Sequence, residues 1–221
     1  MPRLRSPETM TGRRPSLDAA YGLDGPEANR RLYRDWAETY DAEFAEAHAY
    51  LLPEAVADAF AAAGGRGPVL DLGAGTGLVG VALARHGVGP VDGTDLSAEM
   101  LAVAATKGAY RRLFEGDLTA RLDVGDGACA GVVSAGTFTN GHVGPEALGE
   151  VVRLLAPGGL ACLSVNARHY VARGFAAALD ALDGLRLRSA TETPIYRAGA
   201  APEGHEGDTA LLLLLDRVDG G

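Results

Sequence analysis

The chain has 221 residues, of which 47% are hydrophobic and 22% are charged, so it is long enough for one domain with a buried core. Its formal net charge of −9 disfavours a nucleic-acid backbone as a partner, and no run of about 18 apolar residues is present to cross a membrane. The basic N-terminal residues are not followed by the apolar segment of a secretory signal peptide, and we therefore expect a cytoplasmic protein.

Residues 1–20 are expected to form a disordered leader that precedes a single domain over residues 21–221. Within that domain we expect cap helices over residues 21–65 and a sheet core over residues 66–221. Paired glycines that begin at Gly64 mark the boundary, because glycine is typical of a helix C-terminus.

The first cap helix is predicted to begin near Asp24, a candidate N-cap, with Pro26 in its first turn. Large apolar side chains then recur every four residues, the spacing of one helix face. This stripe consists of Leu32, Trp36, Tyr40 and Phe44. A second helix follows, and both helices are expected to lie over the ligand-binding edge of the sheet.

From residue 68 onward, strands and helices are predicted to alternate, which is typical of a parallel sheet covered on both faces. The predicted strands span residues 68–72, 90–95, 111–117, 130–136 and 160–166, and the predicted helices span 76–87, 97–108, 144–159 and about 170–182. Two further strands, 185–197 and 208–218, are joined by a turn-rich segment and should pair antiparallel. We predict an α/β fold with a doubly wound, Rossmann-like, mixed seven-stranded sheet whose last strand is antiparallel.

The two cysteines, Cys129 and Cys162, lie in apolar, strand-like segments. Neither has a second cysteine or a histidine cluster at metal-ligand spacing. We expect two buried free thiols and predict neither a disulfide nor a metal site.

The segment 69–80, VLDLGAGTGLVG, places four glycines directly after a predicted strand. A phosphate-binding loop would carry a lysine after its last glycine, and this segment has none. A dinucleotide fingerprint would have its third glycine where Leu78 stands, although spacing alone leaves a dinucleotide-dependent oxidoreductase as an alternative. The spacing therefore favours a cofactor without phosphate.

Three carboxylates follow consecutive predicted strands and should meet at one edge of the sheet, where ligands of open α/β sheets bind. Asp71 could attract an ammonium group directly or through water, and Asp95 could accept the protons of both ribose hydroxyls. Asp117 suits an adenine amino group, with the amide of Leu118 nearby. Three acids without a basic neighbour fit a cationic, phosphate-free cofactor, and S-adenosylmethionine is such a cofactor.

Several motifs together resemble those of the class I S-adenosylmethionine-dependent methyltransferases: VLDLGAGTG, DLSAEML, EGDL, and LLAPGG followed by LSV. The resemblance covers roughly residues 28 to 218. The segments YRDWAETYD and SAGTFTNGHVGPEAL look like the small-molecule branch related to the methyltransferase of the Williams–Beuren syndrome region. The resemblance implies methyl transfer from S-adenosylmethionine, with S-adenosylhomocysteine as the product.

The resemblance also implies which residues contact the cofactor. Tyr33 and Tyr40 would close over the methionine part, and Ala135 would contact the amino group. The other residues assigned to the cofactor are Gly73, Gly75, Asp95, Leu96, Asp117 and Leu118.

The predicted reaction is an in-line displacement that moves the methyl group to an oxygen or nitrogen of a small molecule. His142, in the loop after the fourth predicted strand, is the candidate general base, although it could equally anchor that loop. The candidate substrate contacts are Phe138, Asn140, His142, His169 and Tyr170. For His169 and Tyr170, packing is an equally good explanation.

The expected partner is a small-molecule substrate, without nucleic acid or membrane, and the protein is expected to be a monomer or homodimer. The segment SAGTFTNGH stands where methyltransferases acting on nucleic-acid amino groups carry an Asn-Pro-Pro-Tyr type of motif. An alternative function is a protein that binds the cofactor without transferring its methyl group, as a sensor, a scaffold or an enzyme that uses only the sulfonium charge.

Overall fold

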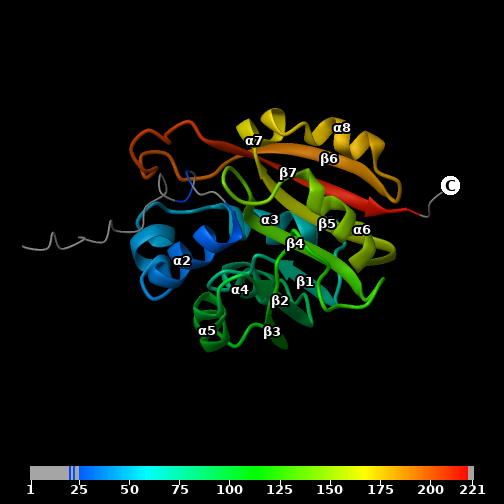
Figure 1. Ribbon diagram of the computed structural model, residues 1–221, viewed down its shortest axis with the longest axis horizontal. Coiled ribbons are helices and arrows are strands. Elements are labelled where there is room, and N and C mark those ends of the chain that lie inside the picture. Colours follow the sequence, from blue (N-terminus) through cyan, green and yellow to red (C-terminus); the bar gives the residue numbers. More distant parts are fainter. Residues whose placement is uncertain (1–19, 21, 23–24, 219–221) are drawn as a thin grey trace, which may run out of the picture.

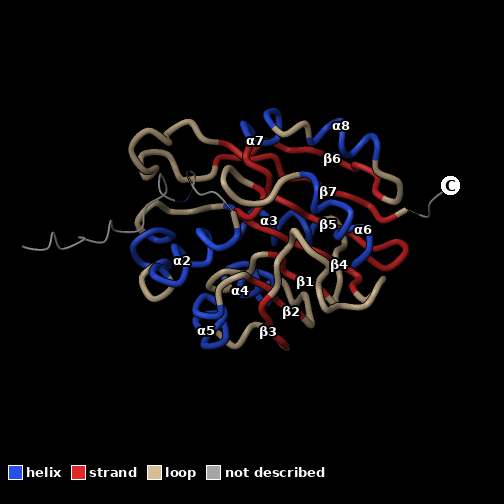
Figure 2. Tube along the Cα trace, in the orientation of Figure 1, coloured by secondary structure: helices blue, strands red, loops and turns tan. Residues whose placement is uncertain are grey.

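Seven strands of the described chain, which comprises residues 20, 22 and 25–218, form one mixed sheet (Figures 1 and 2). The strands are β1 (Val69–Leu72), β2 (Val91–Asp95), β3 (Arg112–Glu115), β4 (Cys129–Phe138), β5 (Leu155–Asn166), β6 (Leu185–Pro194) and β7 (Thr209–Arg217). Their order is β3-β2-β1-β4-β5-β7-β6, in which β1 to β5 are parallel and β7 is antiparallel to both of its neighbours. The predicted seven-stranded sheet with an antiparallel last strand is confirmed.

In the computed structural model, two features predicted near the N-terminus lie outside the described residues. The leader predicted over residues 1–20 lies outside the described residues apart from Ala20, which is buried, and the Asp24 cap also lies outside them.

Cys129 and Cys162 are both buried free thiols, and burial raises the pKa of the Cys129 thiol to about 11. Within the described part of the chain, no helix is both long and apolar enough to span a bilayer.

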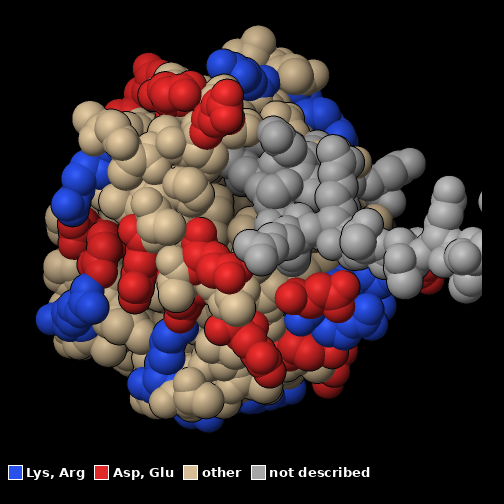
Figure 3. Space-filling view, turned by 90° about the vertical axis from the view of Figure 1, so that its left-hand side faces the viewer, with Lys and Arg blue, Asp and Glu red and all other residues tan. Residues whose placement is uncertain are grey.

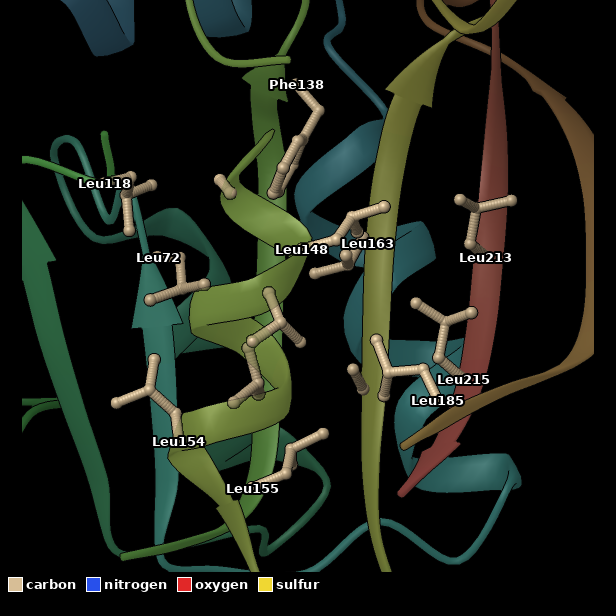
Figure 4. Packing of buried hydrophobic residues seen from close by; sticks show 14 of the residues in the cluster. Leu72, Leu118, Phe138, Leu148, Leu154, Leu155, Leu163, Leu185, Leu213 and Leu215 are labelled. Carbon is tan, nitrogen blue, oxygen red and sulfur yellow. The ribbon is translucent and has the colours of Figure 1, made fainter. Parts of the chain in front are cut away.

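Helices cover both faces of the sheet. The helices on one face are α3 (Leu52–Ala62) and α4 (Leu78–Arg85), with α5 (Ala98–Thr106) over β2 and β3, and those on the other are α6 (Leu148–Leu154), α7 (Ala167–Ala172) and α8 (Phe175–Ala181). Successive side chains of a strand point to opposite faces of the sheet. Val69 therefore packs against α3 and α4 on one face, whereas Leu70 and Leu72 pack against α6 and α8 on the other. Figure 4 shows the leucines of the second cluster, and each such burial contributes roughly 1.5–3 kcal/mol.

The long first helix expected from the apolar stripe is divided into two pieces. Helix α2 (Pro26–Trp36) is followed by a turn and then by a short π-helix, η1 (Asp41–Glu46). The aromatic members of the stripe nevertheless stay together, because the ring centroids of Trp36 and Tyr40 lie 5.1 Å apart, as do those of Tyr40 and Phe44. The spacing therefore predicted the shared face of the stripe but missed the change of helix type.

The expectation that both N-terminal helices lie over the ligand edge is corrected for the second one. Helix α3 packs on the sheet face, against α4, β4 and β5, whereas α2 lies at the edge, on the left in Figure 1. The physical reason is the composition of α3, since Val56, Ala57 and Phe60 are fully buried and require a broad apolar surface.

Two later boundaries also differ from the prediction. The helix expected over residues 144–159 is shorter, because a 3₁₀ turn, η2 (Pro145–Ala147), leads into α6 and β5 already begins at Leu155. The helix expected over about 170–182 is two helices, α7 and α8, separated at Gly174 with φ of 68°. Glycine at a positive φ ends one helix and starts the next in a new direction.

Candidate active site

A cavity of about 190 Å³ lies at the carboxyl ends of the parallel strands, where ligands of open α/β sheets bind. A single water needs only about 10–15 Å³, so the cavity has room for a ligand much larger than water. Its wall is formed by the loops after β1, β2, β3 and β4, by the end of β5, by α2 and η1, and by residues after β6. Figure 3 views the molecule from the side of α2, and on the described surface acidic and basic side chains are interspersed without a continuous basic patch.

The loop after β1 is built on three glycines with positive φ: Gly73, Gly75 and Gly77, at 71°, 53° and 91°. A Cβ on Gly73 would lie 2.0 Å from Oγ1 of Thr137, so the close approach of the end of β4 requires glycine there. A Cβ on Gly75 would meet no atom within 4 Å, so that residue leaves open space at the cavity wall. The loop thus presents backbone, rather than side chains, to a ligand.

Asp95, at the end of β2, holds this loop in place. Its Oδ2 accepts a hydrogen bond of 2.8 Å from the amide of Gly75, and its Oδ1 accepts one of 3.0 Å from the amide of Ser97. Burial raises the pKa of Asp95, and the hydrogen bonds from Ser97, Gly75 and Leu96 partly offset that shift. Each carboxylate oxygen can accept a further hydrogen bond, so Asp95 can also serve a ligand in the cavity.

The end of β3 contributes a second acid to the cavity wall. Oδ1 of Asp117 accepts hydrogen bonds from the amide and the hydroxyl of Thr119, at 2.8 and 2.6 Å, which form a local turn. The neighbouring Leu118 is buried at the same wall. Nine of the residues predicted to contact a cofactor therefore line one cavity: Tyr33, Tyr40, Gly73, Gly75, Asp95, Leu96, Asp117, Leu118 and Ala135.

Asp71 is the predicted cofactor residue that the structure does not place on the cavity wall. Its side chain is fully buried within β1, and its Oδ2 accepts a hydrogen bond of 2.7 Å from the hydroxyl of Tyr110. Burial raises the pKa of Asp71 to about 7, the Tyr110 hydrogen bond opposes that shift, and the charge of Asp95 adds to it. The expected direct attraction of a ligand ammonium group to Asp71 is not supported by this position.

Tyr110 explains why the fourth glycine of the segment 69–80, Gly80, is required. The sequence analysis did not predict this role of Tyr110. The amide of Gly80 donates a hydrogen bond of 3.0 Å to the Tyr110 hydroxyl, and a Cβ on Gly80 would lie 2.4 Å from the tyrosine ring. The only sequence signal was the glycine itself, which gave no indication of its partner. Gly80 thus makes room for a side chain of the protein rather than for a ligand.

The N-terminal segment, which consists of α2 and η1, binds the glycine loop through polar contacts. The sequence analysis did not predict these contacts. Oγ1 of Thr76 donates to Oδ1 of Asp41 at 2.5 Å, and Nζ of Lys107 lies 2.5 Å from Oδ2 of the same carboxylate. Nζ of Lys107 also donates to the carbonyl of Thr76. Lys107 is the only lysine of the chain, and this was the only feature of the sequence that drew attention to the residue. It gave no indication of the contacts with Asp41 and Thr76.

His142 lies on the cavity wall with both ring nitrogens engaged. Nδ1 is 2.9 Å from the carbonyl oxygen of Asn140, and Nε2 is 2.9 Å from the hydroxyl of Tyr33 on α2. Because a carbonyl oxygen only accepts, Nδ1 carries the proton and Nε2 accepts from Tyr33. Burial lowers the pKa of His142, and nearby His169 lowers it further. The imidazole is therefore neutral at pH 7 and above, and the lone pair of Nε2 accepts from the hydroxyl of Tyr33.

The other predicted substrate contacts divide into two groups. Phe138 lines the cavity, but Asn140, His169 and Tyr170 do not. Nε2 of His169 lies 3.0 Å from the carbonyl of Val143 and Nδ1 lies 3.2 Å from Oδ1 of Asn140, so both residues stabilise the loop after β4. Tyr170 stacks on a phenylalanine of α8 at 5.7 Å. For these residues, packing and loop stabilisation replace the expected substrate contact.

Residues 69–159 match the protein family described as a methyltransferase domain. The matched residues run from β1 into the start of β5 and include Gly73, Asp95, Asp117 and His142. The prediction of a methyltransferase is thus confirmed at the level of this domain.

Two relatives and one solved structure are also similar to this chain. Methyltransferase-like protein 27 of Homo sapiens is 31% identical over 158 residues, which cover 69% of this chain and 64% of that protein. Demethylmenaquinone methyltransferase of Thermus thermophilus is 41% identical over 96 residues, or 41% of this chain and 43% of that protein. The matches thus span less than two thirds of either relative's own length. A TehB-like SAM-dependent methyltransferase from Corynebacterium glutamicum shares the fold, with a TM-score of 0.55 at 24% identity over 87% of this chain and 97% of that chain.

The cavity beside the matched residues fits S-adenosylmethionine by its chemistry. Asp95 and Asp117 provide acceptors at the ends of β2 and β3, and Gly75 leaves backbone facing open space. Among the described wall residues, the basic side chains are His142, which is neutral, and Arg30, whose Nε donates 3.0 Å to the carbonyl of Leu96. A phosphate group would thus have little cationic support, whereas a cationic sulfonium would meet acids and aromatic rings. Among the described residues, no group of three or more side chains could hold a metal ion.

Proposed function

We propose that this domain transfers a methyl group from S-adenosylmethionine to an oxygen or nitrogen of a small molecule. The observation that carries the proposal is that one cavity joins the glycine loop and Asp95 to the neutral imidazole of His142. A cofactor site and a proton acceptor that share one cavity are what such a transfer requires. We also expect a cytoplasmic protein that acts as a monomer or homodimer, without nucleic acid as a partner.

The cofactor would supply a methyl group that its own sulfonium charge already activates. Asp95 would accept the ribose hydroxyl protons, and Asp117 with the amide of Leu118 would hold the adenine. Gly75 would let the main chain approach the amino-acid part, because no Cβ occupies that space. Tyr33 and Tyr40, from the N-terminal segment, would cover the methionine part and exclude water.

His142 would act on the acceptor rather than on the cofactor. Its Nε2 would take the acceptor's proton while the acceptor's lone pair forms the bond to the methyl carbon and the departing electron pair remains on sulfur. The carbonyl of Asn140 fixes the imidazole in the tautomer this step needs and stabilises the imidazolium that results. The products are the methylated acceptor, S-adenosylhomocysteine and one proton, which His142 returns to solvent.

Two alternatives predict different ligand binding. A dinucleotide-dependent oxidoreductase would bind NADH, whereas a cofactor-binding protein without transferase activity would bind S-adenosylhomocysteine but methylate nothing. Calorimetric titration of the full chain with each ligand distinguishes the oxidoreductase from the proposed methyltransferase. We expect binding of S-adenosylhomocysteine and no binding of NADH. Tight binding of NADH without S-adenosylhomocysteine would overturn the proposal.

The second alternative is tested by transfer of label. Methyl-labelled S-adenosylmethionine is incubated with a metabolite extract of the source organism, with and without the protein, and the products are read by mass spectrometry. We expect a labelled small molecule that forms only with the protein and is greatly reduced with the His142→Asn variant. Normal cofactor binding with no labelled product would favour a protein that binds the cofactor without methylating.

A further inference from the structure

The cavity has two halves of different chemical character. The half at β1, β2 and β3 carries the glycine loop and two acids, which the proposed function assigns to the cofactor. The other half is lined by aromatic rings: Tyr33, Trp36, Tyr40, Phe44, Tyr50 and Tyr196. The proposed function also places Tyr33 and Tyr40 over the methionine part of the cofactor, so these two rings border both halves. Neighbouring pairs of these rings have centroids between 5.1 and 6.4 Å apart, so they form a continuous apolar wall. Flat apolar molecules pack well on such surfaces.

Among the described residues, the aromatic half presents no fully charged side chain to a ligand. The charged wall residues are Asp95 and Asp117, which follow β2 and β3, and Arg30, which binds the carbonyl of Leu96 after β2. A carboxylate placed against the rings would therefore lose its hydration without a cationic partner. An ammonium group would lack a carboxylate and would share the cavity with the cofactor's positive charge.

Among the described wall residues, His142 is the imidazole base of this half, and it already binds a hydroxyl of a particular kind. Nε2 of His142 accepts from the hydroxyl of Tyr33, 2.9 Å away, and that hydroxyl is a phenol. The opposite nitrogen is fixed by the carbonyl of Asn140, so the acceptor lone pair cannot turn elsewhere without losing that bond. A second phenolic oxygen of similar size and acidity could take the same position on Nε2.

We infer that the acceptor is an uncharged, flat molecule that presents a weakly acidic hydroxyl, phenolic or enolic, to Nε2 of His142 in place of the Tyr33 hydroxyl. This inference rests on the proposed function and specifies its substrate class. The hydroxyl proton passes to Nε2, the oxygen lone pair forms the new carbon–oxygen bond, and the sulfur–carbon electron pair stays on sulfur. The product is a methyl ether, and one positive charge moves from sulfur to His142 without a second cation in the cavity.

Three probes that share one ring system test the inference: 2-naphthol, 2-naphthoate and 2-(aminomethyl)naphthalene. Each is titrated into the full chain saturated with S-adenosylhomocysteine, by calorimetry and by fluorescence of Trp36, the only tryptophan of the chain. We expect 2-naphthol to bind at least about tenfold more tightly than either charged probe, because the charged groups would be desolvated without a partner. A Trp36→Phe variant has no tryptophan, so it gives the background fluorescence of each probe, against which the change in Trp36 emission is measured.

The outcomes separate failure of the inference from failure of the proposed function. If S-adenosylhomocysteine binds but a charged probe binds best, or none of the three binds, the substrate class is wrong and the proposed function stands. If S-adenosylhomocysteine itself does not bind, the proposed function fails first. The labelled product from the metabolite extract gives an independent result, since an alkali-stable ether supports the inference and a methylated amine or methyl ester overturns it.

A variant of Tyr33 tests whether the substrate hydroxyl replaces the Tyr33 hydroxyl on Nε2 of His142. In Tyr33→Phe the ring remains but the hydroxyl that competes for Nε2 is gone, so 2-naphthol should bind several-fold more tightly. Binding of 2-(aminomethyl)naphthalene serves as the matched control and should change little. Weaker binding of 2-naphthol to the variant would contradict the exchange.

Discussion

The hydroxyl of Tyr33 lies 2.9 Å from Nε2 of His142, across 109 positions of the chain, and this contact joins α2 to the loop after β4. It places a polar residue of the N-terminal segment against the candidate general base inside the cavity. Asn29 reinforces the same junction, because its Nδ2 donates 2.9 Å to the carbonyl of Gly141. The N-terminal segment therefore completes the site rather than merely covering it.

His142→Asn should reduce the rate of methyl transfer. Loss of a positioned general base typically costs about 10²–10⁴-fold in rate, while the cofactor half of the cavity is untouched. The check is a turnover assay with the labelled methyl donor alongside calorimetry with S-adenosylhomocysteine. A variant with normal turnover would show that His142 only anchors its loop, and one with lost cofactor affinity would point to a structural role.

The rate should depend on pH through His142. Burial lowers its pKa below the ordinary value of 6.5, and the charge of His169 on α7 acts in the same direction, while the Asn140 carbonyl opposes them. Tyr33 faces the ring from α2 as a neutral hydroxyl. The base is active when unprotonated, so the rate should be level near pH 7 and fall as pH decreases through a midpoint below 6.5. A midpoint clearly above 6.5 in the wild-type pH–rate profile, absent in His142→Asn, would contradict this assignment.

Asp71→Asn should stabilise the protein at alkaline pH. The pKa of Asp71 is about 7 in the folded chain and near 3.8 when exposed, so the folded state retains a proton that the unfolded state releases. Stability from this group is therefore greatest below pH 3.8, declines as pH rises toward 7 and is constant above it, with a total of roughly 4 kcal/mol. The asparagine oxygen can still accept from Tyr110 without a buried charge.

The measurement for Asp71 is the free energy of unfolding by urea at pH 5 and pH 8, with Asp92→Asn as the control. Asp92 is partly exposed and pairs with exposed Arg111, so that variant should change stability little. Equal pH slopes for wild type and Asp71→Asn would contradict the buried-carboxyl account. The same variant tests the expected ammonium contact, because unchanged affinity for S-adenosylhomocysteine would exclude Asp71 as a cofactor ligand.

Lys107→Met should loosen the N-terminal segment. The variant removes the ion pair with Asp41 and the bond to the carbonyl of Thr76, contacts that are only a fifth to a third exposed, so the expected loss is roughly 1–2 kcal/mol. Affinity for S-adenosylhomocysteine should fall several-fold, and limited proteolysis of the N-terminal segment should accelerate. Arg85→Met is the matched control, since its pair with Glu54 is more than half exposed on both sides. Equal effects of the two variants would refute a specific role for Lys107.

Asp95→Ala should weaken binding of S-adenosylhomocysteine by at least about tenfold, because a hydrogen bond to a charged group contributes roughly 1.5–3 kcal/mol. Since Asp95 also holds the amide of Gly75, the ribose role needs a separate readout. A cofactor analogue without ribose hydroxyls should bind wild type and variant with similar affinity, so the two changes should be non-additive. Additive losses would instead indicate that Asp95 acts only on the glycine loop.

Much of the fold followed from local patterns. The alternation of apolar strands and helical segments predicted the parallel sheet, and the turn-rich connection predicted the antiparallel pair β6 and β7. The predicted ends of helices and strands were less accurate where a helix passes directly into a strand. Strand β5, for example, begins at Leu155, five residues earlier than expected. Helix α3 was placed over the wrong surface because its sequence reveals an apolar face without indicating which surface covers it.

The sequence by itself determined the glycine loop, the acids at the ends of β2 and β3, and His142 after β4, because the carboxyl ends of parallel strands must meet at one edge. Only the tertiary structure decided which side chains occupy the space around them. It turned Asp71 inward to Tyr110 and brought Lys107 to Asp41, pairs that are 39 and 66 positions apart. Contacts over such distances depend on how the helices pack against the sheet, which local spacing does not encode.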